Sequence, residues 1–178
     1  MFNLFNKKHE ASTYNFNPII IDFCETLGFC SGGLCEILQP YYKKRPHNPD
    51  EYIWDAFGFL LAYIYEQDGI DQNEVIVITK AFSTNFTFNK RFDAKMYASI
   101  LQASQFYSQR FFDMNRTKSH TMPDVIVYNL LRPLSFKPFS SINIMEVDIL
   151  EVSTLWASIS DFLKNIVIPQ INIVLEKM

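Results

Sequence analysis

The residues whose types and spacing could do chemistry lie in the nine-residue stretch GFCSGGLCE, residues 28–36. Cys30 and Cys35 flank a Ser-Gly-Gly tripeptide, and Cys24 lies just upstream. Such a stretch could hold a metal ion through thiolates, carry out thiol–disulfide exchange, or bind a phosphate on exposed backbone N–H groups. It could also be a tight corner between two helices, with no chemistry at all.

The cysteine spacing argues against a metal or redox site. Zinc-binding and redox cysteines typically come in pairs separated by two residues, whereas five and four residues separate these three. No second pair follows downstream. His47 could act as a base for Cys30 or Cys35, but no local sequence signature supports a nucleophile pair. We expect no metal and no cofactor.

A phosphate loop is also poorly supported, because the full glycine spacing, the lysine and the preceding strand are missing. The interpretation that remains is the corner. Gly28 would end one helix, Ser31 would cap the next, and Gly32 and Gly33 would permit close packing. The cysteines would then be small buried apolar side chains.

Asp55 is the other candidate for chemistry, since it is a carboxylate within the apolar stretch 52–65. A buried acid must be paired or have its pKa raised. The structural interpretation places Asp55 at a rim or next to a basic group such as Arg91 or Lys95. The functional interpretation places it in a ligand pocket lined by aromatic residues.

The elements that must position these residues are helices. The chain has 178 residues, of which 28 are aromatic, and a 48% hydrophobic fraction can fill one core. Apolar residues recur at intervals of three or four, so we expect an all-α fold: one compact domain, 1–178, of about six to seven helices, with 1–16 as a candidate flexible segment. The expected helices span 18–28, 31–40, 49–67, 72–83, 90–113, 123–131 and a last segment from about 144, which Pro169 should kink or break near 165–169.

Helix 49–67 is expected at the centre, because apolar residues cover most of its circumference. Its remaining strip is Asp55, Gly58 and Ala62, which would let another helix approach closely. In helix 72–83, Asp71 and Glu74 form a capping-box pattern, although the β-branched run that follows also suits a strand.

Charge is uneven along the chain, although the net charge is only −3. Residues 51–84 carry six acidic and one basic side chain, and residues 85–137 carry eight basic and three acidic. We read this as two helices that face one another. The basic segments 41–47 and 90–118 mix aromatic and cationic residues, as nucleic-acid-binding proteins do, but the net charge argues against that function.

Three cysteines and no visible signal peptide indicate a cytoplasmic protein. The apolar stretch 52–65 is too short to span a bilayer, and polar residues interrupt 155–175, so we expect no membrane span.

Function follows by elimination, because no catalytic motif is evident. We expect a bacterial protein-binding domain rather than an enzyme, acting as an inhibitor or a toxin-neutralising immunity protein on a cationic toxin or enzyme. The alternatives are a small-ligand-binding protein or enzyme built around Asp55, and a nucleic-acid-associated factor. The expected partner-binding residues are loop aromatics with a neighbouring cation and a cluster of acids at a helix–helix turn: Tyr41, Tyr42, Arg45, Phe86 and Phe88, and Glu66, Asp68, Asp71 and Glu74.

Overall fold

The computed structural model describes residues 16–42, 49–68, 70–85, 92–117, 122–131 and 149–176. Within these ranges the chain is helical and has no strand, which confirms the all-α prediction. The helices are α1 (Pro18–Leu38), α2 (Asp50–Asp68), α3 (Gln72–Asn85), α4 (Ala94–Thr117), α5 (Met122–Leu130), α6 (Ile149–Phe162) and α7 (Ile168–Leu175).

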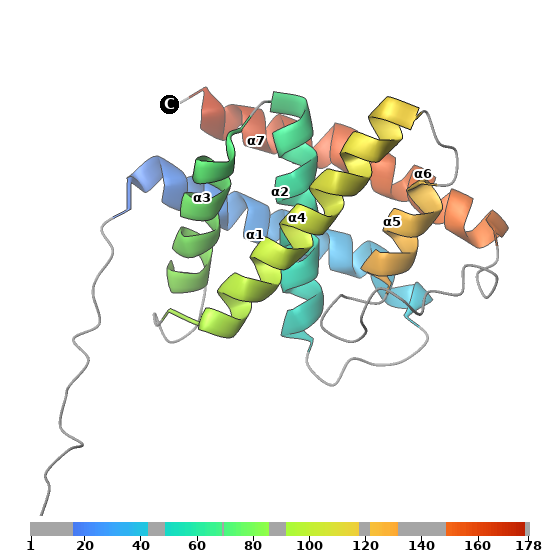
Figure 1. Ribbon diagram of the computed structural model, residues 1–178, viewed down its shortest axis with the longest axis horizontal. Coiled ribbons are helices and arrows are strands. Elements are labelled where there is room, and N and C mark those ends of the chain that lie inside the picture. The colour runs from blue at the N-terminus through green and yellow to red at the C-terminus, as the bar shows by residue number, and fades with distance from the viewer. Residues whose placement is uncertain are drawn as a thin grey trace, which may run out of the picture.

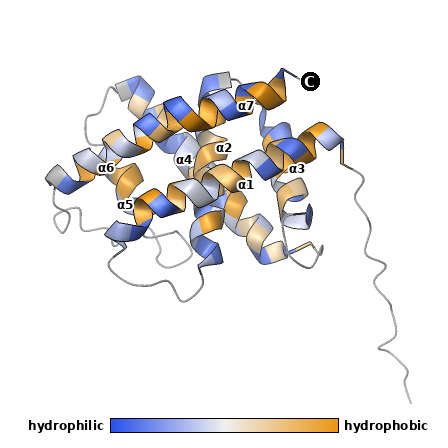
Figure 2. Ribbon diagram, turned by 180° about the vertical axis from the view of Figure 1, so that it is seen from behind, coloured by the Kyte–Doolittle hydropathy of each residue, from blue (hydrophilic) through white to orange (hydrophobic). Residues whose placement is uncertain are grey.

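The helices pack in three layers (Figure 1). Helix α2 stands in the middle, α4 crosses in front of it, and α1 with α6 and α7 lies behind, while α3 and α5 flank α2 on either side and each packs against α4 and a helix of the rear layer. From behind, α1 and the continuous rod of α6 and α7 cross the molecule (Figure 2). Every residue of α2 from Trp54 to Ala62 is buried, as expected of a helix enclosed by other helices.

The close approach predicted for the strip on α2 occurs at Gly58, where α4 crosses. A Cβ atom added to Gly58 would lie 2.5 Å from Ala103 Cβ, 2.8 Å from the Ile100 carbonyl oxygen and 2.9 Å from the Ser104 nitrogen. Two of these atoms are backbone, so they cannot move aside by a change of rotamer. Glycine at this position therefore lets the two helices pack backbone to backbone.

The corner predicted at residues 28–36 is wrong, because α1 runs unbroken through the stretch. The Ser31 hydroxyl donates to the Leu27 carbonyl (2.7 Å), four residues back, instead of capping a new helix. Gly33 faces the Phe162 ring of α6, with 3.1 Å between its virtual Cβ and that ring. Glycines inside a helix cost stability, and the burial of Leu27 and Leu34 on the same helix offsets that cost.

The predicted capping box at the start of α3 is present in both directions. Asp71 Oδ1 accepts from the backbone N–H groups of Asn73 (2.6 Å) and Glu74 (2.9 Å), and Glu74 Oε2 accepts from the Asp71 N–H (2.9 Å). The β-branched run therefore forms a helix and not a strand. Val75 and Ile78 are buried, whereas Ile76 and Val77 between them are exposed, which is helical spacing.

Pro169 disturbs the last helix by widening it rather than by breaking it. Residues Leu163–Val167 form one π-helical turn, in which the Ile168 N–H donates to the Leu163 carbonyl, five residues back. Proline has no N–H to donate and its ring crowds the preceding turn. A π turn accommodates such a defect while the helix axis continues. The irregularity predicted near 165–169 is thus present.

Helix α1 was not considered as a membrane span in the sequence, yet Pro18–Tyr41 is long and apolar enough to cross a bilayer. Length and composition alone fit a core helix equally well, and in this structure α1 packs against α2, α3, α6 and α7. Localisation stays a prediction.

The glycines offer a matched test of the α2–α4 contact. We expect Gly58→Ala to lower the free energy of unfolding by about 1–3 kcal/mol, because the added methyl group overlaps the α4 backbone. Gly32→Ala places its methyl group in open space on α1, so it should raise stability by up to about 1 kcal/mol through helix propensity. Urea unfolding monitored by circular dichroism measures both. Equal effects of the two substitutions would contradict the close approach.

Candidate functional site

The acidic cluster predicted as a partner surface lies where α2 ends and α3 begins. Glu66 is in the last turn of α2, Asp68 is its final residue, and Asp71 and Glu74 cap α3. Asp71 and Glu74 are exposed and Glu66 is half-buried. The structure therefore brings these acids together at one end of the molecule.

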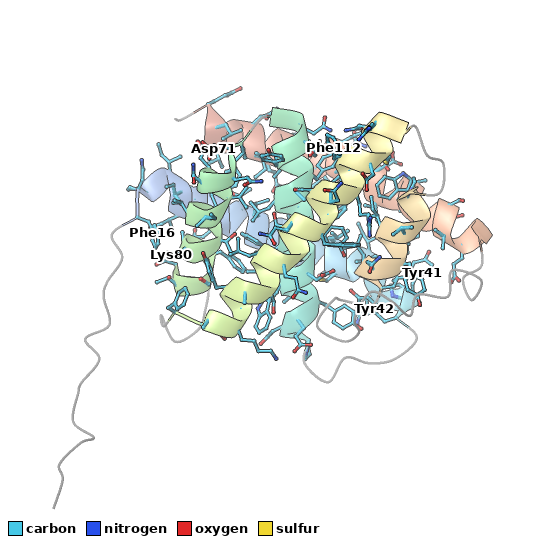
Figure 3. The ribbon with its side chains drawn as sticks, viewed as in Figure 1. Phe16, Tyr41, Tyr42, Asp71, Lys80 and Phe112 are labelled. Carbon is cyan, nitrogen blue, oxygen red and sulfur yellow. The ribbon has the colours of Figure 1, made fainter. Side chains whose placement is uncertain are left out.

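Of the predicted aromatic surface, the two residues that the structure describes, Tyr41 and Tyr42, lie apart from this cluster. Tyr41 and Tyr42 lie on the opposite side of the molecule from Asp71 (Figure 3). The Tyr42 ring packs on the Tyr52 ring, with 4.2 Å between the centroids, and its hydroxyl group is buried next to Cys35. Tyr42 is thus half-buried, with its hydroxyl group turned inward, and its role in partner binding stays a prediction. Arg45, Phe86 and Phe88 lie outside the described residues.

A groove opens beside the acidic cluster, between α3 and α4, with the last turn of α2 as its floor. Its volume is about 400 Å³. Helix α2 contributes Tyr65 and Glu66, and α3 contributes Gln72, Val75 and Ile76. Helix α4 contributes Leu101, Ser104, Gln105, Ser108, Gln109 and Phe112.

The groove combines exposed apolar side chains with hydrogen-bonding groups. Phe112 is 51% exposed and Ile76 is 43% exposed, which is high for large apolar residues. Figure 3 places Phe112 on α4, on the same side of the molecule as Asp71 at the start of α3. Amide and hydroxyl side chains occupy most of the positions between Leu101 and Phe112 on α4. Such a surface can bury apolar groups and hydrogen-bond to a peptide backbone.

Glu66 is the one charged residue among those that line the groove. Among the described residues, no cation forms an ion pair with it. Partial burial raises the pKa of Glu66 above its ordinary value. A carboxylate that loses hydration without gaining a counter-ion is less stable as an anion, so a bound cation would stabilise it.

The α4 wall of the groove was not predicted from the sequence. Residues 101, 104, 105, 108 and 112 recur at helical spacing, next to the apolar stripe that packs against α2. Their serines and glutamines read as an ordinary solvated face. One feature of the sequence could have indicated this wall: a stripe of serine and glutamine side chains on α4 that ends at Phe112.

Asp55 is buried and lies in the core rather than in the groove. Its Oδ2 accepts a hydrogen bond from the Tyr107 hydroxyl (2.7 Å). Burial and the nearby Asp55 carboxylate raise the pKa of Tyr107 well above its ordinary value, so this tyrosine stays protonated and donates. The pairing predicted with Lys95 is wrong: Lys95 Nζ lies 2.7 Å from Glu51 Oε1, one turn earlier on α2. Arg91 lies outside the described residues.

The three cysteine thiols are buried or half-buried and protonated. Desolvation raises the pKa of Cys24 to about 12, of Cys30 to about 11 and of Cys35 to about 12. A thiol that deprotonates only in strong base is a poor nucleophile at neutral pH. Within the described ranges, no three potential metal-binding side chains come together.

Two cations of the basic segment 90–118 are engaged within the fold. Lys95 pairs with Glu51 across α2 and α4. Arg110 lies over the Phe106 ring, 4.9 Å from its centroid, and its Nη1 is 3.6 Å from Asp113 Oδ2. The Lys95–Glu51 pair fits the interpretation that the charged segments face one another, whereas the Arg110 contacts lie within α4.

Comparison with protein-family models, with curated proteins and with solved structures finds no match to this chain.

The Asp55–Tyr107 bond provides a test of the core. Tyr107→Phe removes the donor and leaves a buried carboxylate with one hydrogen bond fewer, so we expect a loss of about 1–3 kcal/mol in the free energy of unfolding. Asp55→Asn should be destabilising as well. A double-mutant cycle by urea unfolding should give a coupling energy between about 0.5 and 3 kcal/mol. Strict additivity would show that the hydrogen bond does not contribute.

Proposed function

We propose that this chain is a protein-binding domain and that the groove between α3 and α4 is its docking surface. The observation that supports this most is that the groove leaves large apolar side chains exposed beside an acid with no cationic partner among the described residues. Exposed apolar residues grouped at a hollow are typical of interaction sites.

The shape of the groove favours a segment of a protein over a small molecule. Its α4 wall runs from Leu101 to Phe112, about 16 Å at 1.5 Å per residue. Small molecules usually occupy sites that enclose most of their surface, whereas this hollow is long and open. Glutamine and serine side chains along it provide donors and acceptors for a partner's backbone.

The charge around the groove favours a cationic partner. Asp71 and Glu74 are exposed at its α3 end, and Glu66 lies inside it. Opposite charge steers a partner to such a surface and raises the association rate at low salt. This is consistent with an inhibitor or a toxin-neutralising immunity protein whose target is a basic toxin or enzyme.

The rival enzyme hypothesis requires Asp55 in a pocket. Asp55 does not line this groove and is bonded to Tyr107 inside the core. The geometry therefore supports protein binding better.

Two exposed phenylalanines allow a matched test. Phe112 lies in the groove, whereas Phe29 lies on α1 in the layer behind and is 72% exposed. The wild-type chain is used to capture partners from cells of the source organism, and the binding of each purified candidate is measured by calorimetry. We expect Phe112→Ala to lower the affinity for the partner that docks in the groove by tenfold or more, as removal of an aromatic anchor does.

Phe29→Ala should leave that affinity within twofold of wild type, and both variants should keep the wild-type helical signal. A partner that binds both variants equally well would contradict docking in the groove.

A further inference from the structure

We propose that the groove is selective for a positively charged side chain, a lysine or arginine of the partner, which pairs with Glu66 while an adjacent apolar group packs between Ile76 and Phe112. This inference rests on the proposed function and names the chemistry that the docked segment must carry.

The groove carries its charge at a single position. Glu66 is its one charged lining residue, and the lining residues that α3 and α4 contribute are neutral. A partner side chain that enters the groove therefore meets a single negative charge on the floor. A cation gains from this placement and an anion is repelled, because the hollow is less hydrated than the open surface.

No cation in the described part of the fold pairs with Glu66. Two other acids of the cluster have structural roles, because Asp71 and Glu74 each accept backbone hydrogen bonds in the capping box. Glu66 is not part of that box and has no cation paired with it within the described part of the chain. Its raised pKa agrees with a carboxylate that is partly desolvated and lacks compensation.

The groups around Glu66 also suit the rest of a cationic side chain. Lysine and arginine carry aliphatic stems that pack on apolar surface while the charged head is bonded. Ile76 and Phe112 offer that surface, and the Gln72 and Gln109 amides offer further acceptor oxygens for N–H groups. The phenol ring of Tyr65 adds an aromatic face, which attracts cations.

Three small probes with the same phenylalkyl skeleton test the charge preference directly. They are phenethylguanidinium, which is cationic, 3-phenylpropionamide, which is neutral, and 3-phenylpropionate, which is anionic. Binding is followed by shifts of the methyl NMR signals of Val75, Ile76 and Leu101, all of which line the groove. We expect the cation to bind at least tenfold more tightly than the amide and the anion to cause no shift at these methyls.

Two glutamate variants assign the preference to one residue. Glu66→Gln should reduce cation binding at least fivefold and leave amide binding unchanged. Glu36→Gln is the matched control, because Glu36 is an exposed acid on α1 that neither lines the groove nor belongs to the acidic cluster beside it. This control should change cation binding less than twofold. Equal binding of the cation and the amide, or undiminished cation binding in the Glu66→Gln variant, would overturn the proposal.

The same variants separate this inference from the proposed function. A partner that is lost in Phe112→Ala but retained in Glu66→Gln would leave the docking groove standing and refute the charge selectivity. If the probes bind with cation selectivity but no partner binds more weakly to Phe112→Ala, the charge selectivity of the groove would stand and docking of a protein partner there would be refuted.

Discussion

The contact between α2 and α4 at Gly58 is the constraint on which the other parts of the structure depend. A helix satisfies its own backbone hydrogen bonds, so α2 can be buried on all sides if its neighbours come close enough to exclude water. On the α4 side, that closeness requires a residue without a side chain, since even a methyl group would overlap Ala103 and the α4 backbone. Helix α3 packs beside α2 against both α1 and α4. The hollow left between α3 and α4, above the last turn of α2, is the groove.

Polar contacts fix the same interface in register. Tyr107 on α4 donates to Asp55 on α2, and Lys95 pairs with Glu51 one turn earlier. Sliding α4 by one turn would leave the buried Asp55 carboxylate without this donor and bring a side chain larger than alanine against Gly58. The Asp55–Tyr107 bond is buried and adds little net stability, but a register without it would leave a buried carboxylate with one hydrogen bond fewer at a larger cost. The Lys95–Glu51 pair is partly exposed, so its contribution is smaller. We infer that these polar contacts specify which face of α4 meets α2, and therefore which face is left to line the groove.

The fold was largely predictable from the sequence where local and long-range signals agree. Residues close together in the chain determine both the capping box at Asp71 and the burial of α2. Residues 28–36 show the opposite case. A serine and two glycines fit a helix boundary, but they also fit the interior of α1, where Gly33 meets Phe162. That ring belongs to a residue 129 positions later in the chain, so the local pattern could not reveal it. The Asp55–Tyr107 contact is a second case, because its residues are 52 positions apart in the chain and a tyrosine hydroxyl carries no charge that would mark it as a partner for a carboxylate.

The candidate site was predictable only in part, because its shape depends on how three consecutive helices, α2, α3 and α4, pack against their neighbours in space. The acids of the α2–α3 turn are adjacent in the chain, and their clustering could be read directly. The wall of the groove that faces these acids comes from α4. Which residues form this wall depends on how α4 is rotated about its axis, because neighbouring residues on a helix point in different directions. Phe111 is buried against α2, packing on Phe59 with 5.6 Å between ring centroids, while Phe112 is half exposed in the groove. Two neighbouring phenylalanines thus have opposite roles, one in the core and one at the surface. The contacts at Gly58 and Asp55 on α2 set the rotation of α4, and this rotation decides which phenylalanine faces the core and which faces the groove. The contacts that hold the core together therefore also determine what the groove can bind.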